Sequence, residues 1–276
     1  MSTPTGGSTS LVVRRPRFEW TDDVPLLPFP DDVSASCELM ALSFTLPYLE
    51  PYLIRTMRAA SKMIDDANLA ADVKAFSGQE AQHHQNHTRL NNAIRAQLSE
   101  DTADAIRSLE DQLEADYRSY TATKSLSFNL AYAEGFEAMT FALARSLLES
   151  PTTDSIVPKW QGLAIWHLAE EIEHRTVTFD AFEAIVDSYP YRAAIGTRSQ
   201  FHFLGYVIRM AAVLERGLGG PNSSTRGVAR ASLRRQWKLG TVPGTLLALS
   251  PRYDPRRVKL SGRVRAVAAS HGVDIG

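Results

Sequence analysis

Glutamate and histidine side chains gather at two points of this 276-residue chain, with the same spacing at each. The first point is the stretch "FSGQEAQHHQNH" (76–87), which contains Glu80, His83, His84 and His87. Residues three, four and seven positions apart lie on nearly the same face of an α-helix, so these side chains would share an arc of roughly 100°. A metal ion bound on one helix face requires such an arrangement of carboxylate and imidazole groups.

The second point is "WHLAEEIEHR" (166–175), where Glu171 and His174 repeat the Glu-x-x-His spacing and His167 lies one turn earlier on the same face. One such motif alone is more typical of a solvated helix face than of a metal site. Two helices that each add a histidine one turn away favour metal binding. We expect the neighbouring Glu170 and Glu173 to point away from this face and to serve solubility.

Two further apolar segments each carry acidic residues. Glu50 lies in "LPYLEPYLIRTMR", and Glu134 and Glu137 lie in "LAYAEGFEAMTFALA". A carboxylate is costly to bury unless it is paired or binds a metal. Dinuclear carboxylate bundles use two Glu-x-x-His helices and one glutamate from each of two other helices. The pattern therefore predicts a two-metal centre, with Glu137 as the preferred ligand of its helix and Glu134 as a replacement or an addition.

Two other polar residues are candidates for supporting roles. We expect His84 to be a neighbour of the ligands or to act behind them, rather than to bind metal itself. Asp180, in "RTVTFDAF", either orients a ligand through a hydrogen bond or is an exposed helix acid. The sequence leaves these two interpretations of Asp180 open.

Helical periodicity begins at about residue 36 and continues through most of the chain. Pro47 and Pro51 are expected to kink the first helix or to end its first turn. No period-two alternation between hairpin turn signals occurs, which predicts an all-α fold in which short loops join antiparallel helices. Four long helical segments are expected, at 39–64, 69–98, 103–150 and 155–189. Two or three shorter helices are expected to follow them.

Composition and helical periodicity divide the chain into an arm and one domain. Residues 1–35 are predicted to be a flexible or extended N-terminal arm, disordered over 1–10, because they are rich in glycine, serine, threonine and proline. Residues 36–276 are predicted to form a single helical domain. Its metal-binding bundle would span about 36–190, with C-terminal helices at about 195–276.

Composition excludes several classes of protein. The net charge is −1, and the single Cys37 rules out a disulfide framework and a cysteine-based zinc site. The apolar run "FHFLGYVIRMAAVL" (201–214) is too short to span a bilayer, and no secretory signal is recognisable at the start. We therefore expect a cytoplasmic protein with no membrane span. Nucleic acid is not an expected partner, and the oligomeric state, including a homodimer, stays open.

Basic residues are concentrated near the C-terminus, where residues 224–276 hold eleven lysines and arginines and two acids. Arg226, Arg230 and Arg234 would form one stripe of a helix. Such a stripe is usually a solvated face or a subunit contact. The alternative is a docking strip for the phosphates of a coenzyme A (CoA) thioester or of a carrier-protein arm.

The stretches "LEPYLIRTMR", "FSGQEAQHHQNH", "EAMT" and "WHLAEEIEHRTVTFD" resemble the motifs of a ferritin-like family labelled predicted metal-dependent hydrolase, over about residues 40–185. The resemblance implies a ferritin-like four-helix bundle with additional C-terminal helices. By motif, it implies eight metal ligands: Glu50, Glu80, His83, His87, Glu137, His167, Glu171 and His174.

The chain departs from the family motifs in three places. "YLEPY" (48–52) replaces GERFF, Ala138 replaces the histidine of EH-[FY]-T, and Arg175 replaces a lysine. The first departure changes a ligand motif, so Glu50 is the least secure of the ligands that the resemblance implies in the first three helices.

The chemistry expected from this donor set is oxidation. Oxygen and nitrogen ligands without thiolate suit iron or manganese, and two irons bridged by glutamates can supply the electrons that split O2. The resemblance extends to a non-haem di-iron monooxygenase of platensimycin-type diterpenoid biosynthesis. We therefore predict O2-dependent hydroxylation of an aliphatic carbon in a bulky apolar substrate, such as a CoA thioester. The cofactors would be two iron ions (Fe2+/Fe3+), with a reductase or ferredoxin-type electron donor as partner.

Two other functions stay open. A dinuclear centre can also activate a water for hydrolysis, which makes a metal-dependent hydrolase the main alternative. The third is a metal-binding bundle without catalysis. For hydroxylation and for hydrolysis alike, the metal ligands would carry the chemistry, and no separate protein nucleophile is required.

Overall fold

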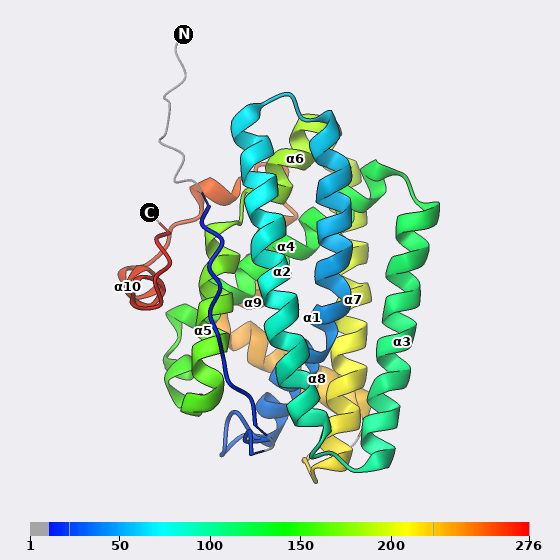
Figure 1. The fold of residues 1–276 in the computed structure, drawn as a ribbon, viewed down its shortest axis with the longest axis vertical. Coiled ribbons are helices and arrows are strands. Elements are labelled where there is room, and N and C mark those ends of the chain that lie inside the picture. Colours follow the sequence, from blue (N-terminus) through cyan, green and yellow to red (C-terminus); the bar gives the residue numbers. More distant parts are fainter. Residues whose placement is uncertain (1–10, 22, 223, 276) are drawn as a thin grey trace.

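The computed structural model describes residues 11–21, 23–222 and 224–275, and these contain helices and connecting segments but no strand (Figure 1). The all-α prediction is confirmed for this part of the chain. The α-helices are α1 (Val33–Ala60), α2 (Ala67–Arg95), α3 (Glu100–Thr123), α4 (Leu126–Glu149), α5 (Pro158–Glu173), α6 (Val177–Ile185), α7 (Tyr189–Gly217), α8 (Thr225–Leu239), α9 (Thr241–Ala248) and α10 (Gly262–Ser270). Short 3₁₀ turns lie at Ser61–Met63, Pro151–Ser155 and Pro255–Arg257.

The central helices form a bundle. Helix α1 packs along both α2 and α7, while α4 packs against α7 on one side and against α5 on another. The core between these helices contains large buried rings such as Phe44, Phe76 and Tyr132. Burial of each such side chain removes apolar surface from water and stabilises the folded state by about 1.5–3 kcal/mol. Among the described residues, no helix is both long and apolar enough to cross a bilayer.

Helix α1 runs through Pro47 and Pro51 without ending, so the expectation that these prolines end its first turn is wrong. A proline has no N–H, so the carbonyls of Ser43 and Pro47 lose their usual helical donors. Side chains of α2 replace them: Asn91 Nδ2 donates to the Ser43 carbonyl at 2.8 Å, and His84 Nδ1 donates to the Pro47 carbonyl at 3.1 Å. Side chains of the neighbouring helix therefore supply the hydrogen-bond donors that the prolines lack.

Two of the expected long helices are interrupted. The segment 103–150 divides at Lys124–Ser125, where the Ser125 side chain caps α4 by accepting from the Phe128 N–H. The segment 155–189 divides at His174, after which α6 begins at Val177. The next helix, α7, has 29 residues and is not one of the shorter helices expected after residue 195. These differences do not change the fold class.

Helices α4 and α7 touch through two glycines. A Cβ on Gly135 would stand 2.1 Å from the Cα of Gly196, so neither helix could come this close with a larger residue there. Next to the contact, Arg192 of α7 donates to Glu134 of α4 at 3.0 Å. This close approach fixes the position of α4, which carries Glu137.

The described part of the N-terminal arm is an extended segment that runs along α2 and α5 (Figure 1). Phe18 packs against Trp166 of α5 at 5.9 Å between ring centroids. Gln79 of α2 donates to the Val12 carbonyl at 3.1 Å. The arm therefore lies on the domain over residues 11–21, and the disorder expected for residues 1–10 falls outside the described residues.

Candidate metal centre

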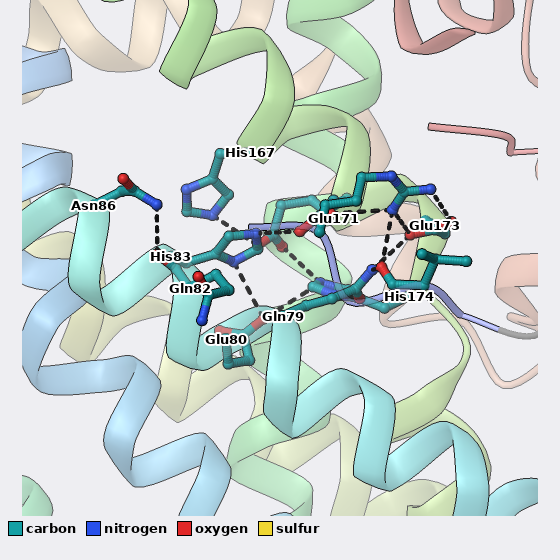
Figure 2. Close-up of polar contacts among 12 residues, drawn as sticks. Gln79, Glu80, Gln82, His83, Asn86, His167, Glu171, Glu173 and His174 are labelled. Carbon is teal, nitrogen blue, oxygen red and sulfur yellow. Dashed lines mark hydrogen bonds and ion pairs between the residues drawn. The ribbon is translucent and has the colours of Figure 1, made fainter. Parts of the chain in front are cut away.

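The eight residues predicted as ligands come together between four helices. Helix α1 supplies Glu50, α2 supplies Glu80, His83 and His87, α4 supplies Glu137, and α5 with its C-terminal end supplies His167, Glu171 and His174. Each of the eight is at most 8% exposed. Figure 2 shows His83 and His174 directed at Glu80, and His167 directed at Glu171.

The donor atoms form four overlapping groups, in each of which all atoms lie within 4.8 Å of one another. One group, at one end of the cluster, joins Glu80 and Glu137 to His174. The other three overlap in their members and combine Glu50–Glu80–His83, Glu50–His87–His167 and His83–His167–Glu171. Glu80 belongs both to the group of His174 and to a group of His83, so it lies between the two ends of the cluster.

Eight donor atoms of this cluster are buried without a hydrogen-bond partner. Buried polar atoms without a partner cost about 1–3 kcal/mol each, and more when they are charged. A bound cation would satisfy all of them, so the donor set fits a metal centre of oxygen and nitrogen ligands. The atoms are Glu50 Oε1 and Oε2, Glu80 Oε1, His83 Nδ1, Glu137 Oε1 and Oε2, Glu171 Oε2, and His174 Nε2.

The pKa values of the clustered glutamates and histidines show the same unsatisfied charge when no metal is bound. Burial, reinforced by the charge of Glu80, raises the pKa of Glu50 well above its usual range. Burial and the charge of Glu171 raise the pKa of Glu137 to about 8. Although burial alone would lower it, the carboxylates of Glu171 and Glu137 raise the pKa of His174. Without a cation, protons therefore compensate the clustered negative charge.

Glu170 does not point away from the centre, and the prediction that it serves solubility is wrong. It is fully buried, and it accepts a hydrogen bond from His83 Nε2 at 3.0 Å. Its other oxygen accepts from Arg14 Nη1 of the N-terminal arm at 3.1 Å. Because His83 donates through Nε2, the Nδ1 of the neutral ring carries the lone pair, which is directed at Glu80, 3.6 Å away.

The same prediction is wrong for Glu173, which joins a second chain of contacts behind His174. Both oxygens of Glu173 accept from Arg14, at 2.7 and 2.9 Å, and one also accepts from Gln79 Nε2 at 2.6 Å. Gln79 Oε1 in turn accepts from His174 Nδ1 at 3.2 Å. This leaves His174 Nε2 free to face Glu137, 3.2 Å away.

His87 and His167 face each other at the other end. His87 Nδ1 donates to Ser43 Oγ at 2.8 Å, because the Ser43 hydroxyl proton is used on Asn91 at 2.6 Å. His87 Nε2 lies 2.7 Å from His167 Nδ1, and His167 Nε2 lies 2.9 Å from Glu171 Oε1. Two ring nitrogens this close share one proton, and a cation could take its place.

The remaining candidates lie outside the four groups. His84 donates to the Pro47 carbonyl, and Glu134 pairs with Arg192. Asp180 is half-buried and pairs with Arg256, so it neither contacts a candidate ligand nor stands free in solvent. On α8, Arg226, Arg230 and Arg234 are exposed, while the opposite side of the helix binds Glu38 of α1 through Ser232 and Arg235.

Sequence reasoning missed the supporting residues Arg14, Ser43, Gln79, Glu170 and Glu173. A signal existed for Glu170, which is three residues after His167 and four before His174, on their shared face. No local pattern connects the arm residue Arg14 to α5.

A model of the family described as predicted metal-dependent hydrolase matches residues 12–259. The chain belongs to this family. No curated protein and no solved structure gives a significant match. Membership indicates a metal-dependent enzyme and fits the hydrolase alternative better than the monooxygenase that we predicted first. The match adds no support for a ferritin-like or diterpenoid relationship.

Proposed function

We propose that this protein is an enzyme that holds two divalent metal ions between α1, α2, α4 and α5. The observation that carries the proposal is the set of eight buried, unpartnered donor atoms on six converging residues. Glu137 and His174 would hold one ion, and Glu50, His83, His87 and His167 the other. Glu80 belongs to a group on each side, and Glu171 lies 2.9 Å from His167 and 3.4 Å from His174, so both carboxylates would be shared. When bound, two such ions supply a water activated for attack on a hydrolysable bond, or, as irons, electrons for the reduction of O2.

Hydrolysis is the first candidate reaction, because the family to which the chain belongs is described as a metal-dependent hydrolase. The two ions would supply the activated water that attacks the bond, so no protein nucleophile is required, and the buried carboxylates would hold the ions. Arg14, through Glu170 and Glu173, would keep the rings of His83 and His174 oriented. The substrate bond would be an ester, an amide or a phosphoester.

O2-dependent hydroxylation of an apolar substrate is the second candidate, favoured by the enclosure and the histidine content of the centre. Phe76 packs edge-on to His174 and Trp166 edge-on to His83, each with ring centroids 4.9 Å apart. Four imidazoles and four carboxylates without a thiolate suit iron. The apolar rings beside them keep water away. This reaction would require an external donor, such as a reductase or a ferredoxin-type protein.

Metal binding is tested by elemental analysis after anaerobic reconstitution with ferrous iron and, separately, with manganese or zinc. We expect about two equivalents per chain. His87→Ala should lower the metal content, whereas His84→Ala is the matched control, because His84 contacts the Pro47 carbonyl instead. Folded wild-type protein without bound metal would refute the proposal, and equal losses in both variants would refute the assignment of His87.

Isotope labelling separates the two reactions. Metal-loaded protein is incubated with esters, amides and phosphoesters in 18O-water without O2, and with apolar acids and their thioesters under 18O2 with a reductant. Product labelled from water without O2 indicates hydrolysis. Product labelled from O2, formed only with the reductant, indicates hydroxylation and would overturn the first candidate.

A further inference from the structure

A basic pocket lies outside the metal centre, between the end of α5 and the C-terminal segment. It has a volume of about 390 Å³, within the range of small-molecule sites. Its walls are Arg175, Arg256, Arg257, Val258, Lys259, Leu260 and Arg265. Five of these seven residues are cations, and no described acidic residue lines the pocket.

Two aspartates outside the pocket, Asp180 and Asp254, compensate part of this positive charge. Arg256 pairs with Asp180 and Asp254, and Arg257 pairs with Asp254 at 3.4 Å. Arg175 donates through Nη1 to the Ile172 carbonyl at 2.6 Å, while its buried Nε has no hydrogen-bond partner. Like charges held this close repel one another, so an anion between them would be favourable.

We propose that this pocket binds a phosphate-bearing organic anion. Guanidinium groups match the oxygens of phosphate with paired hydrogen bonds, and several cations around one cavity favour a doubly charged group over a carboxylate. The pocket is concave, which distinguishes it from the outward-facing stripe of Arg226, Arg230 and Arg234 on α8. Its cations also come from two separate parts of the chain, so the fold brings them together.

The organic part of the ligand would extend from the mouth of the pocket, because the adjoining apolar cavity has a volume of only about 10 Å³. Val258 lines both cavities, and Ala138, Phe141 and Tyr253 line the smaller one. Arg175 directly follows His174 in the chain, and Ala138 directly follows Glu137. The ligand would therefore lie beside the metal centre, yet its binding is independent of the proposed reaction.

Calorimetric titration with phenyl phosphate, at low ionic strength, tests this proposal. We expect saturable binding to one site per chain. Arg257→Gln/Lys259→Gln should weaken it by about tenfold, because both side chains are exposed and their loss removes two charges from the pocket. Arg226→Gln/Arg230→Gln, which removes two charges from the α8 stripe, is the matched control and should change affinity by less than about twofold.

Benzoate, with the same ring and a single charge, distinguishes a phosphate site from a carboxylate site. We expect it to bind about tenfold more weakly than phenyl phosphate. Equal or tighter binding of benzoate, absence of saturable binding of phenyl phosphate, or equal losses in the two double variants would each overturn the proposal. The metal content of every variant is measured in parallel, so a failure of the metal centre is recognised separately.

Discussion

The ring of His83 shows how single residues prepare this site. Glu170 accepts a hydrogen bond from Nε2, so in the neutral ring Nδ1 carries the lone pair and faces the carboxylates. Against the effect of burial, hydrogen bonds from His83 and Arg14 keep the pKa of Glu170 below its usual range, so Glu170 stays an acceptor. A carboxylate behind a ligating histidine fixes the orientation and raises the basicity of the ring.

We expect Glu170→Ala to weaken metal binding by about 10–100-fold, because the buried Nε2–H of His83 loses its partner. Glu170→Gln retains an acceptor oxygen and should recover most of the affinity. Glu149→Ala, at the exposed end of α4, is the control for removal of an acid. Affinities are measured by competition with a chelator. Unchanged affinity in Glu170→Ala would show that the hydrogen bond does not position His83.

At this scale the sequence predicts those residues whose spacing repeats. The two Glu-x-x-His motifs and their extra histidines were recognisable because a helix places them on one face. Arg14 was not, since it reaches Glu170 across 156 positions of the chain. Neither was the role of Glu173, which depends on Gln79 of another helix.

At the scale of elements, the prolines of α1 show what sequence alone cannot settle. Both lie within one turn of Glu50, and propensity alone argues for a break there. The carbonyls they leave free are satisfied by Asn91 and His84 of α2, which only the packed bundle brings near. The interruption after Glu173 is equally hidden, because neither glycine nor proline occurs near it. There, Arg175 caps the free carbonyl of Ile172.

The contact between α4 and α7 should be highly sensitive to the size of the side chain at position 135. Gly135→Ala would place Cβ 2.1 Å from the Gly196 backbone, so the helices must separate. We expect the free energy of unfolding to fall by about 1–3 kcal/mol or more. Gly205→Ala in α7 is the control, because nothing lies within 4 Å of its Cβ, and it should stabilise by about 0.5–1 kcal/mol. Urea denaturation measures both, and a neutral Gly135→Ala would contradict the close packing.

For the whole molecule, the all-α class followed from periodicity, but the distribution of charge did not. Of the eleven basic residues of 224–276, three form the α8 stripe and four line the pocket beside α5. Sequence spacing reveals the stripe, because its members are four residues apart on one helix. It cannot reveal the pocket, because Arg175 and Lys259 are 84 positions apart and meet only in the folded chain.

The buried cluster also makes the stability of the whole metal-free chain depend on pH. The pKa of Glu137 is raised to about 8, chiefly by burial. Burial opposes a rise for His83, but the hydrogen bond to Glu170 and the nearby carboxylate of Glu80 raise its pKa to about 10. A group whose pKa is higher in the folded chain stabilises fully below its unfolded pKa and loses this contribution as pH rises through the folded pKa. The depressed pKa values of Glu171, His87 and His167 act only at lower pH.

Between pH 7 and 9 the metal-free chain should therefore lose stability, by about 1–3 kcal/mol in the free energy of unfolding. Bound metal requires the deprotonated ligands, so the metal-loaded chain should gain affinity and lose little stability over the same range. Glu137→Gln removes one of the titrating groups and should reduce the dependence, whereas Glu149→Gln on the exposed end of α4 should not. Urea denaturation of both forms at pH 7, 8 and 9 measures the effect. If the metal-free chain became more stable towards pH 9, protons would not be compensating the buried carboxylates.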